Sequence, residues 1–138
     1  MNIPHQLEDP VRTAARDIVG DAPLATSALT RAVVHRSKRY TSERDRLSAP
    51  TDRKADLAAR AAFFTIADAL KVAIPLGELA NRGAIPPRRP LRVTDLGAGC
   101  GALSLGLVAS LESDAAGGAM FELTLVDRDV DALRIAAD

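Results

Sequence analysis

Residues 91–106 read Leu-Arg-Val-Thr-Asp-Leu-Gly-Ala-Gly-Cys-Gly-Ala-Leu-Ser-Leu-Gly. A short apolar strand runs through Asp95 into a loop with glycines at positions 97, 99 and 101. Glycine lets the backbone turn sharply and approach a ligand without interference from a Cβ atom. The following run, residues 102–111, can form a helix whose N-terminus faces the same ligand. The pattern predicts a strand, a loop and a helix that bind a nucleotide cofactor.

Asp95 discriminates between the cofactors that use such a loop. In the dinucleotide-binding fingerprint, the residue two before the first glycine lies in a buried strand and is normally apolar, and a pyrophosphate docks on the helix N-terminus. A carboxylate at this position would repel a pyrophosphate. It would attract a ligand that carries an ammonium and a sulfonium.

The segment Asp-Leu-Gly-Ala-Gly-Cys-Gly, residues 95–101, resembles the first motif of the class I S-adenosylmethionine-dependent methyltransferases. The resemblance implies that S-adenosylmethionine is the cofactor and that the loop backbone approaches its amino-acid and ribose portion. It assigns Asp95 to the cationic end of the cofactor, directly or through water. The loop residues that it implies in cofactor binding are Gly97, Ala98, Gly99 and Gly101.

A second strand is predicted at residues 121–126, Phe-Glu-Leu-Thr-Leu-Val, which alternate and then run apolar as a buried strand does. This strand ends at Asp127, and ligands of open α/β sheets bind beyond the carboxyl ends of the strands. Asp127 comes 26 positions after Gly101, and the small polar stretch 112–119, interpreted as a flexible loop, accounts for this long separation. In the methyltransferases that the chain resembles, the matching acidic residue binds the ribose hydroxyls, and Asp127 inherits that role.

Other interpretations of the glycine loop remain open. Gly97, Gly99 and Ala102 satisfy the looser G-x-G-x-x-A form of a nicotinamide or flavin domain, so an NAD(P)-binding Rossmann oxidoreductase is an alternative, against which Asp95 argues. A glycine-rich turn can also be a tight connection without a ligand. Cys100 is interpreted as a small spacer in the loop. As the only cysteine, it excludes a disulfide within the chain and a multi-cysteine metal site, and it fits a reducing cytosol.

The sequence divides into a helical N-terminal region at residues 1–85, a proline-rich linker at 86–90 and a partial S-adenosylmethionine-binding Rossmann-like domain at 91–138. The stretch from Thr41 to Pro50 is polar and is expected to be irregular. The expected helices run from Glu8 to Val19, closed by Gly20, from Leu24 to Tyr40, from about Asp52 to Ala73, ending before Pro75, and from Leu76 to Asn81, stopped near Gly83.

The fold class is predicted to be α/β, a helical region followed by the β-α-β-α start of a Rossmann-like methyltransferase fold. Residues 91–138 are too few for the strand-helix units that this fold normally contains, so the sequence is interpreted as truncated. Two parallel strands with one crossover helix leave sheet edges and apolar faces uncovered. We expect the isolated chain to be marginally stable or self-associating and inactive as an enzyme. The acceptor-binding residues of the family come from later strands, so no catalytic residue can be named.

Charge is divided between the two parts, although the total is zero. Residues 1–90 hold 15 basic and 10 acidic side chains, whereas residues 91–138 hold 3 basic and 8 acidic ones. The positive excess lies between Arg31 and Arg60, where an RNA-modifying enzyme would hold phosphates. A solvated helical face is the simpler explanation. Tyr40 is the one aromatic side chain in the basic stretch that could stack on a base, which argues against the binding of single-stranded RNA by this segment.

A further resemblance involves the region before the glycine loop. The basic stretch with Tyr40, then Ala-Asp-Leu-Ala-Ala-Arg-Ala-Ala-Phe-Phe-Thr-Ile-Ala-Asp-Ala-Leu-Lys, then Leu-Gly-Glu-Leu, resembles the entry to the methyltransferase-like proteins related to the mitochondrial small-ribosomal-subunit factor. It implies that ribosomal RNA or the small ribosomal subunit is the substrate or partner. A non-catalytic ribosome-assembly or RNA-interaction module that keeps the nucleotide fold is the other alternative.

No apolar run reaches membrane-spanning length, and the N-terminus lacks the basic and apolar regions of a signal peptide. The sequence therefore predicts a cytoplasmic protein without membrane contact.

Overall fold

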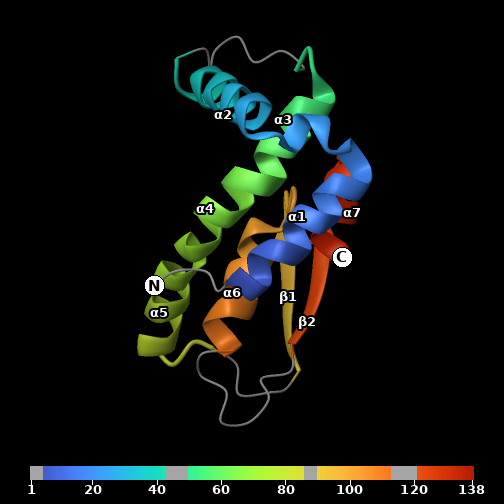
Figure 1. Cartoon of the computed structure of the whole chain (residues 1–138). Helices are drawn as coiled ribbons and strands as arrows, with labels where there is room; N and C mark the ends of the chain where they lie inside the picture. Colours follow the sequence, from blue (N-terminus) through green and yellow to red (C-terminus); the bar gives the residue numbers. More distant parts are fainter. Residues whose placement is uncertain (1–4, 43–49, 86–89, 113–120) are drawn as a thin grey trace.

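The computed structural model describes residues 5–42, 50–85, 90–112 and 121–138 (Figure 1). The fold is mixed α/β, mostly helical, with a two-stranded parallel sheet. In chain order the elements are α1 (His5–Val19), η1 (Ala22–Leu24), α2 (Thr26–Thr41), α3 (Arg53–Ala59), η3 (Arg60–Thr65), α4 (Ile66–Ala69), η4 (Leu70–Val72), α5 (Ala73–Asn81), β1 (Leu91–Leu96), α6 (Ala102–Glu112), β2 (Phe121–Val126) and α7 (Val130–Ala137).

The first helix begins earlier than the sequence pattern indicates. α1 starts at His5 rather than at Glu8, and Pro10 lies inside it. Its expected end at Val19 is confirmed, because Gly20 follows in the left-handed region, with φ 81°. The second expected helix is split into the 3-10 turn η1 and the helix α2, which begins at Thr26.

The two helices expected at about Asp52–Ala73 and at Leu76–Asn81 are joined in one run of five helical segments, from α3 to α5. Asp52 caps its start by accepting a hydrogen bond from the Ala55 N–H at 2.9 Å. The middle segment, η3, is a π-helix in which the Thr65 hydroxyl donates to the Arg60 carbonyl at 2.9 Å. The expected stop before Pro75 is wrong, since Pro75 falls in the first turn of α5, where its missing N–H costs no helical hydrogen bond.

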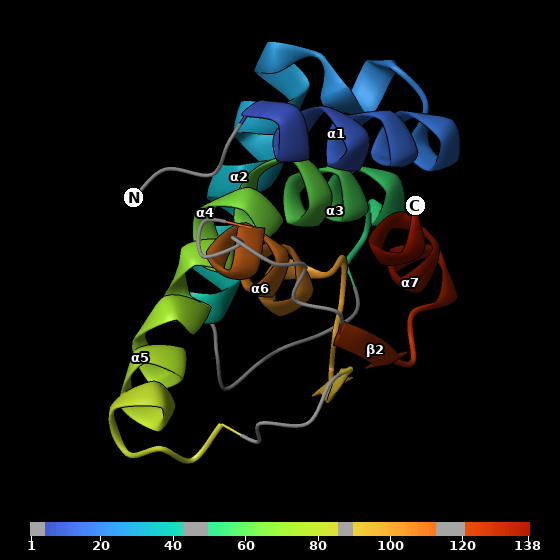
Figure 2. The same cartoon turned by 90° about the horizontal axis from the view of Figure 1, so that it is seen from below.

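The two strands pair in parallel, with Asp95 opposite Leu125 and Leu96 opposite Val126. Exposure alternates along both strands, so that one sheet face is covered and the other is open. Figure 2 shows α1, α3, α6 and α7 on the same side of the two strands. On the open face Leu96 is 77% exposed and Val126 is 46% exposed. Within the described residues, the sheet is therefore covered on one face only.

The core joins the helical region to the segment that contains the strands. α1 packs against α3, η3 and α7, and α6 packs against α4 and η4. Gly106 lies where α6 crosses α4, and a Cβ atom there would come within 1.8 Å of the Ala69 carbonyl oxygen. The buried cluster consists of small side chains with few large ones: Ala14, Ala15, Val19, Leu57, Ala58, Ala61, Cys100, Ala132 and Ile135.

Several expectations fall outside the described residues. The structure leaves out residues 86–89 of the proline-rich linker at 86–90, residues 43–49 of the polar stretch at 41–50, and residues 113–119 of the loop expected at 112–119. No helix in the described ranges is long and apolar enough to cross a membrane.

Candidate functional site

The glycine loop lies at the carboxyl end of β1, where α3 approaches the strand ends (Figure 1). Its three glycines, Gly97, Gly99 and Gly101, have φ angles of 79°, 55° and 85°, which other residues rarely adopt. The N–H groups of Gly97 and Ala98 both donate to the Val126 carbonyl, at 2.7 and 3.1 Å. The loop is therefore held against the end of β2.

The three glycines have different surroundings. Nothing lies within 4 Å of a Cβ atom placed on Gly97, so this residue faces open space. A Cβ on Gly101 would lie 3.0 Å from the Ala136 Cβ, so the close packing of α7 explains the glycine at this position. Gly97 remains as the loop glycine with open backbone, whereas Gly99 lies beside Arg60 with its N–H bonded to Asp127, and the predicted site residue Ala98 is buried.

Asp127 lies beside the glycine loop, as its place after β2 predicts. Its Oδ2 accepts a hydrogen bond from the Gly99 N–H at 2.8 Å, and its Oδ1 accepts one from the Asp129 N–H at 2.8 Å. The pKa of Asp127 is lowered, chiefly by the bond from Asp129 and also by that from Gly99, which together outweigh the effect of partial burial. Asp127 is thus an anionic acceptor, and two of its roughly four lone-pair positions are occupied.

Asp95 lies beneath the loop rather than at its open side. Its side chain is on the covered face of the sheet and the residue is only 7% exposed. The Ser104 hydroxyl, in the first turn of α6, donates to its Oδ2 at 3.3 Å. Asp95 is therefore a buried side chain on the covered face of the sheet, joined by Ser104 to the start of α6.

Arg60 and Asp129 complete the site, and sequence patterns do not single them out. The Arg60 Nη1 donates to the Asp129 Oδ2 at 2.5 Å, and its Nη2 lies 3.4 Å from where a Cβ on Gly99 would be. Burial by itself would raise the pKa of Asp129, but the hydrogen bonds from Arg60 and the Ala132 N–H, together with the charges of Arg60 and Arg53, outweigh it and the pKa is lowered. Burial opposes the charge on Arg60, yet its negative surroundings raise its pKa. Both groups are charged at neutral pH.

A cavity of about 470 Å³ opens beside Asp127 and Arg60, a size within the range of small-molecule sites, roughly 300–1,000 Å³. Its walls come from α2, α3 and the segment after β2. The charged side chains that line it are Arg36, Arg39, Arg53, Asp56, Arg60, Asp127, Arg128 and Asp129. Five arginines and three aspartates therefore line this cavity, which adjoins Asp127 and Arg60, and the described residues that line it include no glycine of the loop.

Several of these arginines are paired inside the cavity wall. Arg36 donates to both oxygens of Asp56, at 2.7 and 2.9 Å, and Arg39 lies 3.6 Å from the same carboxylate. The guanidinium of Arg36 also lies over Tyr40, 4.6 Å from the ring centroid, and 5.8 Å from the centroid of Phe64. Tyr40 of α2 and Phe64 of η3 therefore both lie beside Arg36. The positions of these residues in the sequence do not predict this arrangement.

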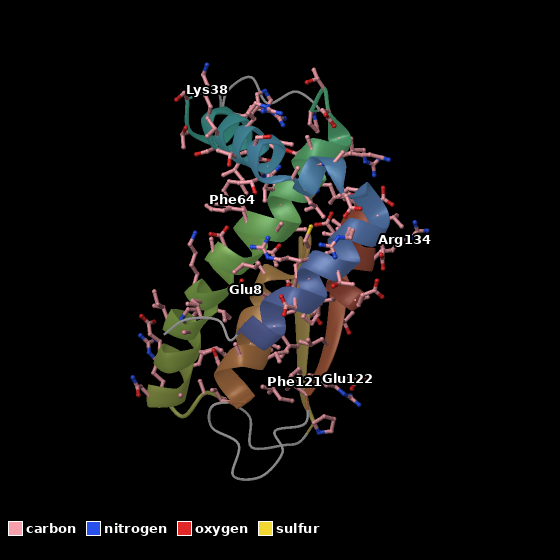
Figure 3. All side chains as sticks on the ribbon, in the orientation of Figure 1. Glu8, Lys38, Phe64, Phe121, Glu122 and Arg134 are labelled. Atoms are coloured by element: carbon pink, nitrogen blue, oxygen red, sulfur yellow. The ribbon has the colours of Figure 1, made fainter. Side chains whose placement is uncertain are left out.

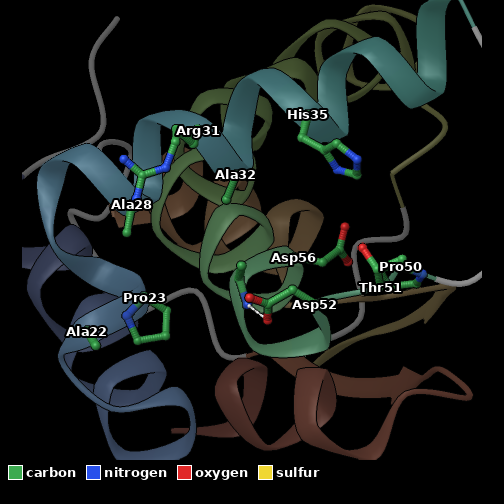
Figure 4. Close-up of a pocket in the computed structure, with 11 residues that line it drawn as sticks. Ala22, Pro23, Ala28, Arg31, Ala32, His35, Pro50, Thr51, Asp52 and Asp56 are labelled. Carbon is green, nitrogen blue, oxygen red and sulfur yellow. Dashed lines mark hydrogen bonds between the residues drawn. The ribbon is translucent and has the colours of Figure 1, made fainter.

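A second cavity, of about 440 Å³, is separate from the glycine loop (Figure 4). It lies between η1, α2 and the start of α3, and its charged or titratable lining residues are Arg31, His35, Asp52 and Asp56. None of its lining residues comes from the segment 91–138. It therefore has no direct contact with the residues predicted to bind a cofactor.

Cys100 lies in the loop between Gly99 and Gly101, and its side chain is buried in the core cluster. Burial raises the pKa of its thiol to about 11. At neutral pH the side chain is an uncharged thiol, which is a poor nucleophile. Its surroundings agree with the interpretation of Cys100 as a packing residue.

The labelled residues Phe121 and Glu122 mark the opposite end of β2 (Figure 3). There the Arg92 side chain donates to Glu122 at 3.0 Å on the open sheet face. This surface ion pair is remote from the site, so a substitution here can serve as a control for substitutions at the site.

No protein-family model matches the chain, and neither a curated protein nor a solved structure matches it.

Proposed function

We propose that the chain binds S-adenosylmethionine at the glycine loop and belongs to a methyltransferase with a Rossmann-like domain. The observation that carries this proposal is the pairing of Asp127 with the Gly99 N–H at 2.8 Å. It brings an anionic acceptor and a ligand-accessible glycine loop together at the carboxyl ends of two parallel strands. Ligands of open α/β sheets bind at this edge.

The chemistry of the site residues fits the proposed cofactor. Asp127 keeps lone pairs free of its two backbone hydrogen bonds, and a ribose diol can donate to them. Gly97 faces open space, so the backbone there can be approached closely. The carboxylate of Asp95 lies under the loop and disfavours a pyrophosphate there, whereas it favours a cationic ligand. These features favour S-adenosylmethionine over NAD(P).

The bound cofactor would supply an activated methyl group. The chain's own residues would orient it, since positioning of the reactants accounts for much of the rate in such transfers. In the cavity wall, Arg36 and Arg39 are paired with Asp56, and Arg53 is paired with Asp129 and Asp131. The cavity still has five arginines against three aspartates, an excess that would favour an acceptor that carries phosphate, such as ribosomal RNA. Two features thus support ribosomal RNA as the proposed methyl acceptor: the charge of the cavity wall, and the resemblance of the helical region to the ribosomal methyltransferase-like family.

The cofactor is tested by isothermal titration calorimetry of the chain with S-adenosylhomocysteine and with NADH. We expect S-adenosylhomocysteine to bind and NADH not to bind. Asp127→Asn should abolish binding, because an asparagine amide cannot accept both backbone hydrogen bonds and lacks the negative charge. Glu122→Gln, which removes a carboxylate from the far end of β2, is the matched control and should bind normally. Binding of NADH without affinity for S-adenosylhomocysteine would contradict the proposal.

A second candidate function is a non-catalytic RNA-interaction module. The charge of α2 favours it, since Arg31, Arg36, Lys38 and Arg39 lie on this helix and it contains no aspartate or glutamate. Such a module would bind RNA with an affinity that falls steeply with salt, because counterions are released on binding. RNA binding of this kind, together with no affinity for S-adenosylhomocysteine, would favour this second function over the first.

A further inference from the structure

Arg60 reaches the glycine loop from a part of the chain far away in sequence. It is the first residue of the π-helix η3, and its side chain is 19% exposed. π-helical turns are rare and occur frequently at functional sites. The backbone of Arg60 has the α-helical angles φ −59° and ψ −51°, and its N–H donates to the Asp56 carbonyl, so α3 itself sets the direction of this side chain.

The guanidinium of Arg60 is fixed over the middle glycine of the loop. Asp129 holds its Nη1, and Asp129 is itself fixed as the N-cap of α7 by a bond from the Ala132 N–H at 3.3 Å. The Nη2 lies 3.4 Å from the place of a Cβ on Gly99, so it stands directly beside the backbone that a loop ligand would touch. An arginine has five N–H donors in a planar fork, and the bond to Asp129 uses one end of it.

The neighbouring carboxylates do not satisfy the rest of this fork in the described structure. Asp127 accepts from the Gly99 and Asp129 N–H groups, and Asp56 accepts from Arg36. A guanidinium in a partly buried position is suited to bind a planar, two-oxygen anion. The amino-acid portion of S-adenosylmethionine carries one such anion, its α-carboxylate.

We propose that Arg60 is a specificity-determining residue that binds the α-carboxylate of S-adenosylmethionine at the glycine loop, an inference that rests on the proposed function. The charged groups at the site then bind different parts of the cofactor. Asp127 takes the ribose hydroxyls, Asp95 attracts the cationic groups from below, and Arg60 takes the carboxylate from above.

The test compares two ligands that differ by this carboxylate alone, S-adenosylhomocysteine and its decarboxylated analogue. Their affinities for the whole chain are measured by calorimetry. The wild-type protein should prefer S-adenosylhomocysteine by about tenfold or more, as expected for a charge-assisted hydrogen bond. Arg60→Gln should lower the affinity for S-adenosylhomocysteine to that of the analogue, while the affinity for the analogue stays the same. Arg60→Lys, which keeps the charge but not the fork, should retain part of the preference.

Each other outcome counts against the inference. If Arg60→Gln weakens both ligands equally, Arg60 only holds η3 against α7. If the preference is unchanged in Arg60→Gln, the carboxylate is bound elsewhere. If neither ligand binds the wild-type protein, the proposed function fails together with the role of Arg60, whereas failure in the variant alone leaves the proposed function intact.

Discussion

The carboxylate of Asp127 and the backbone N–H of Gly99 are joined by a hydrogen bond of 2.8 Å. The two residues follow neighbouring parallel strands, and the bond ties the glycine loop to the end of β2. The same carboxylate holds the start of the segment that leads into α7 through the Asp129 N–H. Asp127 therefore shapes the loop and, in the proposed function, also receives the ligand.

The packing of α6 leads to a prediction about stability. Gly106→Ala should destabilise the protein by about 1–3 kcal/mol or more, because the added Cβ would lie 1.8 Å from the Ala69 carbonyl oxygen and force the helices apart. Gly77→Ala is the matched control, since nothing lies within 4 Å of a Cβ there and alanine favours an α-helix by about 0.5–1 kcal/mol. Urea unfolding measures both changes. A stable Gly106→Ala variant would show that α6 and α4 do not pack this closely.

Local sequence patterns predicted the elements whose signals lie within a few residues. The strand at 121–126 and the helix that begins at Ala102 are confirmed. They were predictable because strand alternation and the glycines before the helix are local features. The position of Asp127 beside Gly99 was also predictable, since the carboxyl ends of parallel strands meet at one edge of a sheet.

Features that depend on tertiary packing could not be predicted in this way. The π-helix at Arg60 interrupts a pattern that looks like one continuous helix, and no residue type marks it. The approach of Arg60 to Gly99 depends on how α3 crosses the strand ends, which spacing along the chain does not encode. The expectation that the helix ends before Pro75 is wrong. A proline breaks the interior of a helix, but Pro75 lies in the first turn of α5, where a proline is tolerated.

Cys100 should be almost unreactive in the folded protein. Its pKa of about 11 leaves very little thiolate at pH 8, so alkylation should be at least about a hundredfold slower than in the urea-unfolded chain. Because the chain has one cysteine, mass spectrometry after iodoacetamide treatment reports on this residue alone. Rapid modification of the native protein would mean that the core beneath the loop opens readily.

Acid should destabilise the fold through Asp127 and Asp129. Both pKa values are lowered from the ordinary 3.8, so the two carboxylates stabilise the folded state above that pH. This contribution is lost as the pH falls from about 4 through the lower pKa values of the folded protein. The urea midpoint should therefore decrease on acidification, and less so in Asp127→Asn. An identical pH dependence in the two proteins would exclude a role for Asp127 in acid unfolding.

The open sheet face should promote self-association. Leu96 and Val126 are opposite each other in the strand register and both are exposed at the site end of the sheet. Replacing both with threonine keeps a residue that favours strands and removes apolar surface. Sedimentation velocity should show oligomers of the wild-type chain that grow with concentration, and fewer of them for the double variant. A wild-type monomer at every concentration would contradict this expectation.

The proposed cofactor site is tested most directly by amide chemical shifts. In a titration with S-adenosylhomocysteine followed by ¹H–¹⁵N correlation spectra, we expect large shifts for the amides of Gly97 and Gly99 and for Asp127. The amides of Gly20 and Gly83, which end helices outside the site, should not move. Shifts confined to residues outside the glycine loop, or no shifts at saturating ligand, would contradict the central claim that this loop binds S-adenosylmethionine.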